Sequence, residues 1–279
     1  MDPKFPDHAR VVIVGGGIIG CSVAYHLARL GWKDVLLLEQ NELAGGTTWH
    51  AAGLVGRLRT TNSMTKINKY SAELYARLEK ETGHSVGWKQ VGSLIVARSE
   101  DRMNQLRRTA AMSEWFGVEV QLISPEAAGE KWPLLRVDDV VGAAWLPHDG
   151  KVVPKEVALA LAKGAQSLGA KVCENVRVMD VEHRAVRAVG VKTNQGHITA
   201  EYVVLTGGMW TRELGLRCGV TIPLYPVEHH YVVTEPIPGA FDELPVGRDP
   251  DLCIYFRGEG DAVMLGAFQA ESKPWMVER

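Results

Sequence analysis

Three glycines near the N-terminus have the spacing of a dinucleotide-binding fingerprint. Gly15, Gly17 and Gly20 form the pattern G-x-G-x-x-G, and Glu39 follows roughly 20 residues later. Gly15 allows a tight turn, Gly17 lets the backbone approach a pyrophosphate, and Gly20 lets a helix pack on the sheet. That helix begins at Ile18, and its N-terminal N–H groups favour phosphate binding. The Glu39 carboxylate suits ribose hydroxyls and disfavours a 2′-phosphate, which leaves FAD and NAD as candidate cofactors.

A second motif lies in a small, polar segment after the fingerprint. Residues 45–54 read Gly-Gly-Thr-Thr-Trp-His-Ala-Ala-Gly-Leu. This segment resembles a motif of the dimethylglycine and sarcosine dehydrogenases, within the broader D-amino-acid-oxidase-like family of flavoproteins. The resemblance covers most of the chain, through residues 87–94, 133–135, 147–150, 207–210, 228–234 and 255–257. Together these segments are far more specific than the glycine fingerprint.

The resemblance implies that FAD is the cofactor and that His50 is joined covalently to the 8α-methyl group of the flavin. A neutral imidazole nitrogen is a good nucleophile, which suits this attachment. The alternative is that His50 is an ordinary loop histidine with no bond to the cofactor. Val176 is expected to contact the adenine through its backbone, and Gly207 and Gly208 to pass close to the dinucleotide. The remaining residues assigned to the cofactor are Gln40, Gly46, Thr47, Thr48 and Leu54.

Two side chains match active-site residues of the same family. His229 corresponds to a histidine suited to help an amine lose its proton, because histidine titrates near neutrality. Tyr255 corresponds to a tyrosine whose ring or hydroxyl can hold the substrate amine. Arg257 shares the face of Tyr255 if the segment is a strand, and it could pair with a substrate carboxylate. An ordinary surface arginine is the favoured interpretation of Arg257, and a surface or strand-pairing histidine is the alternative for His229.

The implied function is FAD-dependent demethylation of an N-methylated amino acid such as sarcosine or dimethylglycine. A hydride equivalent passes from the N-methyl carbon to the flavin, and the iminium then releases formaldehyde or passes its carbon to a folate. Oxygen or an electron-transfer protein reoxidises the flavin. The alternatives are a non-catalytic subunit resembling the pyruvate dehydrogenase phosphatase regulatory protein, and a truncated fragment that binds FAD weakly. His50, His229 and Tyr255 favour the enzyme, because that regulatory protein lacks the attachment histidine.

Apolar periodicity indicates the elements that position these residues. A strand over 10–14, a helix over 18–30 and a strand over 34–38 form a β-α-β unit, which implies a parallel sheet. In the helix predicted over 65–81, Ile67, Tyr70, Leu74 and Leu78 share one face. Further helices are predicted over 101–116 and 154–168, with another starting at 124. Further strands are predicted over 91–97, 140–146, 171–173, 176–182, 186–193, 197–199, 202–206, 225–234, 254–257 and 262–266.

The predicted fold class is α/β, with two interleaved domains. Residues 1–85 and 140–222 are assigned to a Rossmann-like FAD-binding domain with a parallel sheet. Residues 86–139 and 223–279 are assigned to a substrate domain with an antiparallel sheet. Family members continue into a segment that completes the fold, so the C-terminal part of the fold is expected to be missing.

Composition excludes several other classes of protein. The formal net charge of the 279 residues is -2, which argues against a nucleic-acid-binding protein. No apolar run reaches the roughly 18–20 residues of a membrane span. The N-terminal residues carry no signal sequence, so a cytoplasmic protein is predicted, with the mitochondrial matrix as the alternative.

The four cysteines, at positions 21, 173, 218 and 253, form no C-x-x-C pair. No metal site is therefore predicted, and all four are expected to be reduced and buried.

Overall fold

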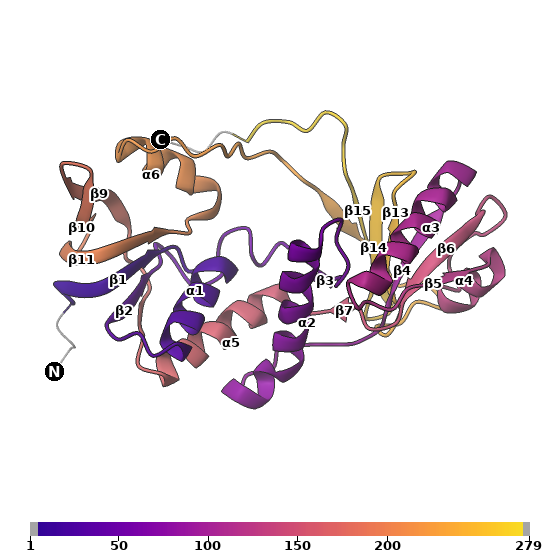
Figure 1. Ribbon diagram of the computed structural model, residues 1–279, viewed down its shortest axis with the longest axis horizontal. Helices are drawn as coiled ribbons and strands as arrows, with labels where there is room; N and C mark the ends of the chain where they lie inside the picture. The colour runs from indigo at the N-terminus through magenta and orange to yellow at the C-terminus, as the bar shows by residue number, and fades with distance from the viewer. Residues whose placement is uncertain (1–4, 276–279) are drawn as a thin grey trace.

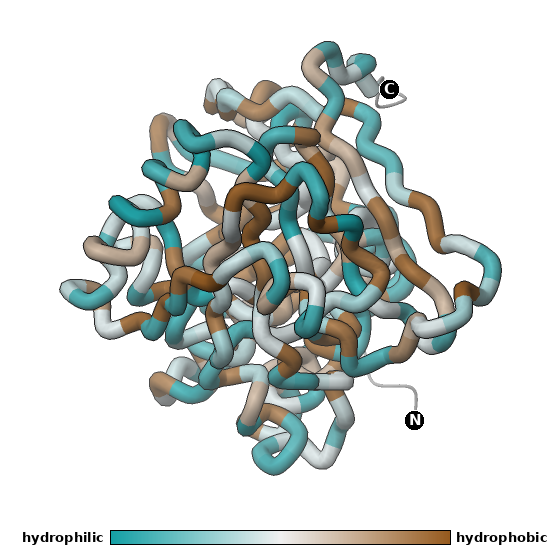
Figure 2. The backbone as a smooth tube through the Cα atoms, turned by 90° about the vertical axis from the view of Figure 1, so that its right-hand side faces the viewer, coloured by the Kyte–Doolittle hydropathy of each residue, from teal (hydrophilic) through white to brown (hydrophobic). Residues whose placement is uncertain are grey.

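A computed structural model describes residues 5–275 as an elongated molecule with a β-sheet toward each end (Figure 1). Helices α1 (Ile18–Arg29), α5 (Pro154–Ser167) and α2 (Asn62–Thr82) follow one another between the sheets, and α5 contacts both of the others. Hydrophobic stretches gather toward the middle, and hydrophilic ones occupy the outer loops (Figure 2). No helix within residues 5–275 is long and apolar enough to span a membrane.

The smaller sheet contains the predicted β-α-β unit. Its strand order is β8-β2-β1-β11-β10-β9, and the first four strands are parallel. The last three form an antiparallel meander at one edge. The strands are β1 (His8–Val14), β2 (Val35–Leu38), β8 (Lys171–Cys173), β9 (Val178–Arg184), β10 (Arg187–Thr193) and β11 (Gly196–Leu205). The strands predicted over 197–199 and 202–206 are one continuous strand, β11, because β1 and β10 pair along its two sides.

Both faces of the central strands are buried, which explains their continuous apolar sequences. Val11 and Ile13 of β1 pack toward α1 and α5, whereas Val12 and Val14 pack into a second cluster on the other face. The predicted face of α2 is only half correct. Leu74 and Leu78 are buried, but Ile67 and Tyr70 are 59% and 41% exposed, and the Tyr70 hydroxyl instead meets His26 Nε2 at 2.7 Å.

The larger sheet is mainly antiparallel, as predicted for the second domain. Its order is β12-β15-β14-β13-β4-β6-β5, and only β13 and β4 pair in parallel. The strands are β4 (Ser93–Ala97), β5 (Gln121–Ile123), β6 (Gly142–Leu146), β12 (Tyr231–Val233), β13 (Val246–Asp249), β14 (Ile254–Glu259) and β15 (Ala262–Ala267). The remaining elements are β3 (Leu54–Val55), which pairs with β7 (Gly150–Lys151), and the helices α3 (Glu100–Trp115), α4 (Pro125–Lys131), η1 (Gly208–Trp210) and α6 (Thr211–Arg217).

Two sequence predictions for this sheet need correction. The strand predicted over 225–234 shortens to β12, which lies at the sheet edge and pairs only with β15. Before it, Val227 makes an isolated bridge to Pro274. The domain boundary predicted at residue 140 places β6 with the FAD-binding domain, whereas β6 pairs with β4 and β5 in the larger sheet. Sheet membership puts this boundary between β6 and α5, and the rest of the division stays a prediction.

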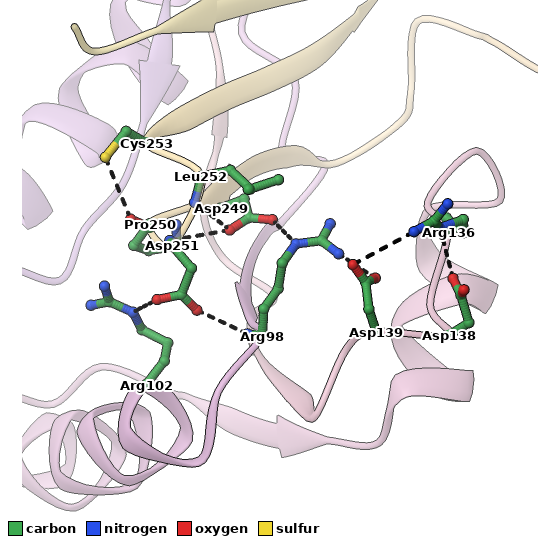
Figure 3. Close-up of polar contacts among 10 residues, drawn as sticks. All are labelled: Arg98, Arg102, Arg136, Asp138, Asp139, Asp249, Pro250, Asp251, Leu252 and Cys253. Atoms are coloured by element: carbon green, nitrogen blue, oxygen red, sulfur yellow. Dashed lines mark hydrogen bonds and ion pairs between the residues drawn. The ribbon is translucent and has the colours of Figure 1, made fainter. Parts of the chain in front are cut away.

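An ionic network holds one end of the larger sheet together (Figure 3). The Asp249 carboxylate, 0% exposed, accepts a hydrogen bond from Arg98 Nε at 2.5 Å. Arg98 also pairs with Asp139, and its backbone N–H donates to Asp251. Arg102 Nε binds the other oxygen of Asp251 at 2.9 Å. These contacts join the start of α3 to the connection that leads into β14, and so fix the strand that carries Tyr255.

The cysteines are free, as expected, but they are not all buried. Cys21 is fully buried in α1, and burial, with the nearby Glu39 charge, raises the pKa of its thiol to about 12. Cys173 and Cys218 are half-buried and Cys253 is exposed. No group of three or more metal-ligating side chains occurs among the residues that the structure describes.

Candidate functional site

A pocket lies where the parallel strands β1, β2 and β11 end, beside the N-terminus of α1 and next to α6. This is the edge at which open α/β sheets bind their ligands. Most of the predicted cofactor-binding residues line it: Gly15, Gly17, Ile18, Glu39, Gln40, Gly46, Thr47, Thr48, Gly207 and Gly208. The sequence did not identify other lining residues, among them Thr206, Trp210, Arg177 and Arg217.

Two fingerprint glycines, Gly15 and Gly20, have the backbone geometry that their spacing predicts. Gly15 adopts a φ of 110°, and a Cβ there would lie 2.6 Å from the Thr206 carbonyl oxygen. A Cβ on Gly20 would lie 1.8 Å from the Gly15 carbonyl oxygen, so Gly20 allows α1 to pack against the turn. The Thr206 hydroxyl donates to the carbonyl groups of Val14 and Gly15, at 2.9 and 3.1 Å. The turn is therefore held in a shape that only glycine permits, and it fits a pyrophosphate cradle.

Glu39 holds two loops at the pocket wall. Its Oε2 accepts the Gly16 N–H at 2.6 Å, and its Oε1 accepts the Asn41 N–H at 2.9 Å. An ionised carboxylate offers about four lone-pair sites, so both oxygens keep acceptor capacity for ribose hydroxyls. The predicted ribose role is compatible with these contacts.

Thr48 joins the second motif to the fingerprint helix. The Ile18 N–H donates to Thr48 Oγ1 at 3.0 Å, and Thr48 is 8% exposed. The N-cap residue Gly17 has no side chain for this purpose, so a threonine distant in sequence caps α1. This contact explains why residues 45–48 lie against the dinucleotide turn.

Replacing Thr48 by valine is expected to lower the free energy of unfolding by about 1 kcal/mol, because the Ile18 N–H loses its acceptor. The affinity for FAD should also fall, since the Gly46–Thr48 wall is released. Urea unfolding and FAD titration by fluorescence measure the two effects. Thr60→Val, at an exposed loop position, is the matched control. Equal stability of the two variants would contradict the capping role.

Four predicted cofactor residues lie outside the pocket wall. Gly20 packs beneath the turn, and Leu54 pairs with Lys151 in the short β3–β7 sheet. The Val176 N–H donates to the Glu39 carbonyl at 2.8 Å and its side chain is buried, so Arg177 and Val178 form the wall instead.

The fourth of these residues, His50, follows the pocket-lining Thr47 and Thr48 on the same loop and is exposed. Its ring lies 3.7 Å from the Trp49 ring, centroid to centroid, at 34°. The imidazole is therefore accessible and packed at a tilt against the Trp49 ring, close in sequence to the pocket wall.

The two predicted catalytic side chains meet on the larger sheet. His229 Nε2 and the Tyr255 hydroxyl are 2.9 Å apart, although the residues come from different segments. The Tyr255 ring covers Gly266, its cross-strand partner, where a Cβ would lie 2.1 Å from the ring. Phe268 packs against both rings, at centroid distances of 5.1 and 5.4 Å. Burial, and then the neighbouring Tyr231, raise the pKa of Tyr255, so its phenol is protonated at neutral pH.

Arg257 is not the surface arginine that the sequence favoured. It is 7% exposed, and its guanidinium pairs with Glu259. The buried Lys151 lies nearby, with Nζ 2.8 Å from both Asp242 Oδ1 and the Gly258 carbonyl oxygen. Burial lowers the pKa of Lys151, and the Arg257 charge adds to this effect. Arg257 is thus part of an internal ionic cluster and already has an anionic partner.

The fold and the pocket define a dinucleotide-binding protein, and comparison with known proteins gives the family. The model of the FAD dependent oxidoreductase family (DAO) matches residues 10–277, so the chain belongs to this family. The L-proline dehydrogenase from P. horikoshii has a similar structure, with a TM-score of 0.88 and 28% identity over 96% of this chain and 71% of that one. The family match therefore supports FAD as the cofactor of this chain.

Three curated relatives match nearly the whole of this chain at 38–44% identity. The 4-methylaminobutanoate oxidase (formaldehyde-forming) of Paenarthrobacter nicotinovorans is 44% identical over 99% of this chain and 34% of its own length. The mitochondrial dimethylglycine dehydrogenase of Rattus norvegicus is 39% identical over 97% of this chain and 32% of its own length. The mitochondrial pyruvate dehydrogenase phosphatase regulatory subunit of Mus musculus is 38% identical over 98% of this chain and 31% of its own length. The chain spans about a third of the length of these relatives.

Proposed function

We propose that this protein uses FAD to oxidise the N-methyl group of an N-methylated amino acid. The observation that carries the proposal is the hydrogen-bonded pair of His229 and Tyr255, in a chain whose pocket fits FAD. The printed names of two relatives, 4-methylaminobutanoate oxidase and dimethylglycine dehydrogenase, support this substrate class. Sarcosine, dimethylglycine and 4-methylaminobutanoate are the candidate substrates.

The proposal gives each of these side chains a role that is compatible with its contacts. An amine must lose its proton before its lone pair can assist oxidation of the adjacent carbon, and we assign His229 as the group that accepts this proton. The Tyr255 hydroxyl holds the His229 ring through Nε2, and its aromatic face can receive an ammonium group. Bound FAD supplies the acceptor for the hydride equivalent. Gly15, Gly17 and the N-terminus of α1 would hold its pyrophosphate.

His50 is proposed as the covalent attachment point of the flavin. Its imidazole is exposed, and its loop continues directly from the pocket wall. A regulatory, non-catalytic role is the competing function, because one relative of similar identity carries that name. The presence of His50, His229 and Tyr255 favours the enzyme.

Anaerobic mixing tests the proposed reaction. FAD-loaded protein is mixed with sarcosine, dimethylglycine or 4-methylaminobutanoate, and the visible flavin absorbance is followed. We expect at least one of them to bleach the flavin and to release about one formaldehyde per flavin reduced. The N-methyl-free twins glycine and 4-aminobutanoate are the controls and should leave the absorbance unchanged. A flavin that none of the three substrates bleaches would reject the oxidase proposal in favour of the regulatory one.

A further inference from the structure

One acidic side chain in the wall of the cofactor pocket has an oxygen without a hydrogen-bond partner. Glu213 of α6 lines the pocket, and its side chain is 33% exposed. Its Oε2 atom is enclosed by protein and accepts no hydrogen bond in the described part of the chain, residues 5–275. Its Oε1 atom pairs with Arg212 Nη1 only at 3.6 Å, which is too long for a hydrogen bond. Buried carboxylate oxygens are normally hydrogen-bonded, so Glu213 has unused acceptor capacity.

The neighbours of Glu213 place it at the end of the pocket that residues 177–178 form. Helix α6 packs on β9, and Leu214 packs against an apolar cluster that includes residues of β9. One turn after Glu213, Arg217 Nη1 donates to the Met179 carbonyl at 3.0 Å. Leu214, Arg217 and residues 177–178 all line the pocket together with Glu213. This end of the pocket is therefore built by α6 and by the segment that leads into β9.

The same segment crosses the carboxyl end of β2, next to Glu39. The Val176 N–H donates to the Glu39 carbonyl at 2.8 Å, and the Asn175 N–H donates to the Asn41 carbonyl at 3.1 Å. In dinucleotide-binding folds, the pyrophosphate lies at the N-terminus of the first helix, and the acidic residue after the second strand binds the ribose. The base is attached to that ribose, beyond the pyrophosphate. It therefore falls at the end of the pocket that residues 177–178 and α6 form.

The charge of Glu213 decides which part of the cofactor it suits. A carboxylate repels the negative charges of the pyrophosphate, so Glu213 suits an uncharged group that donates hydrogen bonds. The ribose hydroxyls already have an acceptor in Glu39. Adenine carries an exocyclic amino group, which is a hydrogen-bond donor. The last torsion of a glutamate side chain is broad and roughly two-fold, so rotation about it presents either oxygen to the pocket.

We propose that Glu213 accepts a hydrogen bond from the 6-amino group of adenine and so makes the pocket selective for adenine nucleotides. The inference concerns the cofactor and does not depend on which amine the protein oxidises. A base without this amino group leaves the carboxylate without a donor, which costs binding free energy. Arg177 and Arg217, in the same wall, have no acceptor atom in their side chains, so they cannot replace Glu213 in this role.

Two nucleotides that differ only in the amino group test this proposal without turnover. ADP carries the 6-amino group, and purine riboside 5′-diphosphate has a hydrogen atom in its place. Both are titrated by calorimetry into apoprotein from riboflavin-starved cells, and far-ultraviolet circular dichroism checks that the protein is folded. Wild-type apoprotein should bind ADP about 10- to 100-fold more tightly than the purine analogue, as expected for a hydrogen bond to a charged group.

Variants of Glu213 should remove this preference in steps. Glu213→Met has a side chain of similar length without a strong acceptor, so it should abolish the preference. Glu213→Gln keeps a neutral carbonyl oxygen and should keep part of it. Glu201→Met removes a glutamate whose side chain is 51% exposed on β11, where it pairs with Arg10, and it should behave as wild type. The purine analogue should bind all four proteins with similar affinity, because it offers Glu213 no donor.

The possible results separate this inference from the proposed function. Equal affinity of wild type for the two nucleotides, or a preference that survives in Glu213→Met, overturns the proposal. An equal loss of affinity for both nucleotides in Glu213→Met assigns the carboxylate to a ribose hydroxyl and overturns it as well, as does a folded wild-type apoprotein that binds neither. A preference that depends on Glu213 supports the proposal, even in a protein whose flavin no N-methylated amino acid bleaches; that result rejects the oxidase function alone.

Discussion

Replacing His50 by alanine is expected to move all of the yellow flavin from acid-precipitated protein into the supernatant. His50 is exposed on the loop that leaves the pocket wall at Thr48, and the Trp49 ring packs against it at a tilt of 34°. Alanine has no nucleophilic atom, so FAD would bind only through reversible contacts. The absorbance of the pellet and of the supernatant after precipitation measures the bound and released fractions.

The control for this experiment is another exposed histidine. His197 lies on β11 and pairs with Glu182, and His197→Ala should leave the flavin in the pellet as in wild type. Release of flavin from wild-type protein would reject the covalent link while keeping the FAD site. Flavin that stays in the pellet of His50→Ala would assign the link to another residue.

The dinucleotide half of the fold was predictable because its signals are local. Its signals follow one another in the chain: the apolar run of β1, the glycines of the turn and the apolar run of β2. The conformation of each of these segments depends mainly on residues close to it in sequence. The positive φ of Gly15 and the close packing of Gly20 confirm the predicted roles. The cap that Thr48 provides to Ile18 depends on a contact across the fold, and no local pattern announces it.

The larger sheet was harder to predict, because a segment at the edge of a sheet can have the alternating apolar pattern of a strand without pairing along its whole length. Residues 225–234 alternate as a strand should, yet only Tyr231–Val233 pair with a strand of the larger sheet, β15, whereas Val227 makes an isolated bridge to Pro274. His229 was expected on a strand and is found on the segment before β12, where it still meets Tyr255.

Charge pairing was the least predictable feature of the candidate site. Arg257 and Arg248 are both arginines on the face of Tyr255, and nothing in the sequence says which has an acidic partner. Glu259 lies two residues from Arg257 and pairs with it, whereas Arg248 lies directly opposite Tyr255 in the β13–β14 pair. Phe268, which covers the His229–Tyr255 pair, is a single aromatic residue after β15 without any accompanying motif.

Replacing His229 by alanine is expected to lower kcat/KM for the N-methylated amino acid by about 10²- to 10⁴-fold, the contribution of a positioned acid–base group. The loss should be at flavin reduction, because the variant cannot take the proton from the bound amine. Stopped-flow bleaching under anaerobic conditions measures that step directly. A flavin spectrum like that of wild type shows that the FAD site is intact.

The adjacent histidine makes the comparison stringent. His230 is exposed and its nearest acidic group is Glu228, at 3.9 Å, so His230→Ala should keep the wild-type rate within about twofold, as expected for a surface substitution.

Tyr255→Phe should lower the rate as well, because the phenol that holds His229 is lost. If the two side chains act as one unit, the double variant His229→Ala/Tyr255→Phe should be little slower than His229→Ala alone. If the rate losses of the two single variants multiply in the double variant, the two side chains have independent roles. If His229→Ala reduces the flavin as fast as His230→Ala, the pair takes no part in the reaction and its hydrogen bond is only structural.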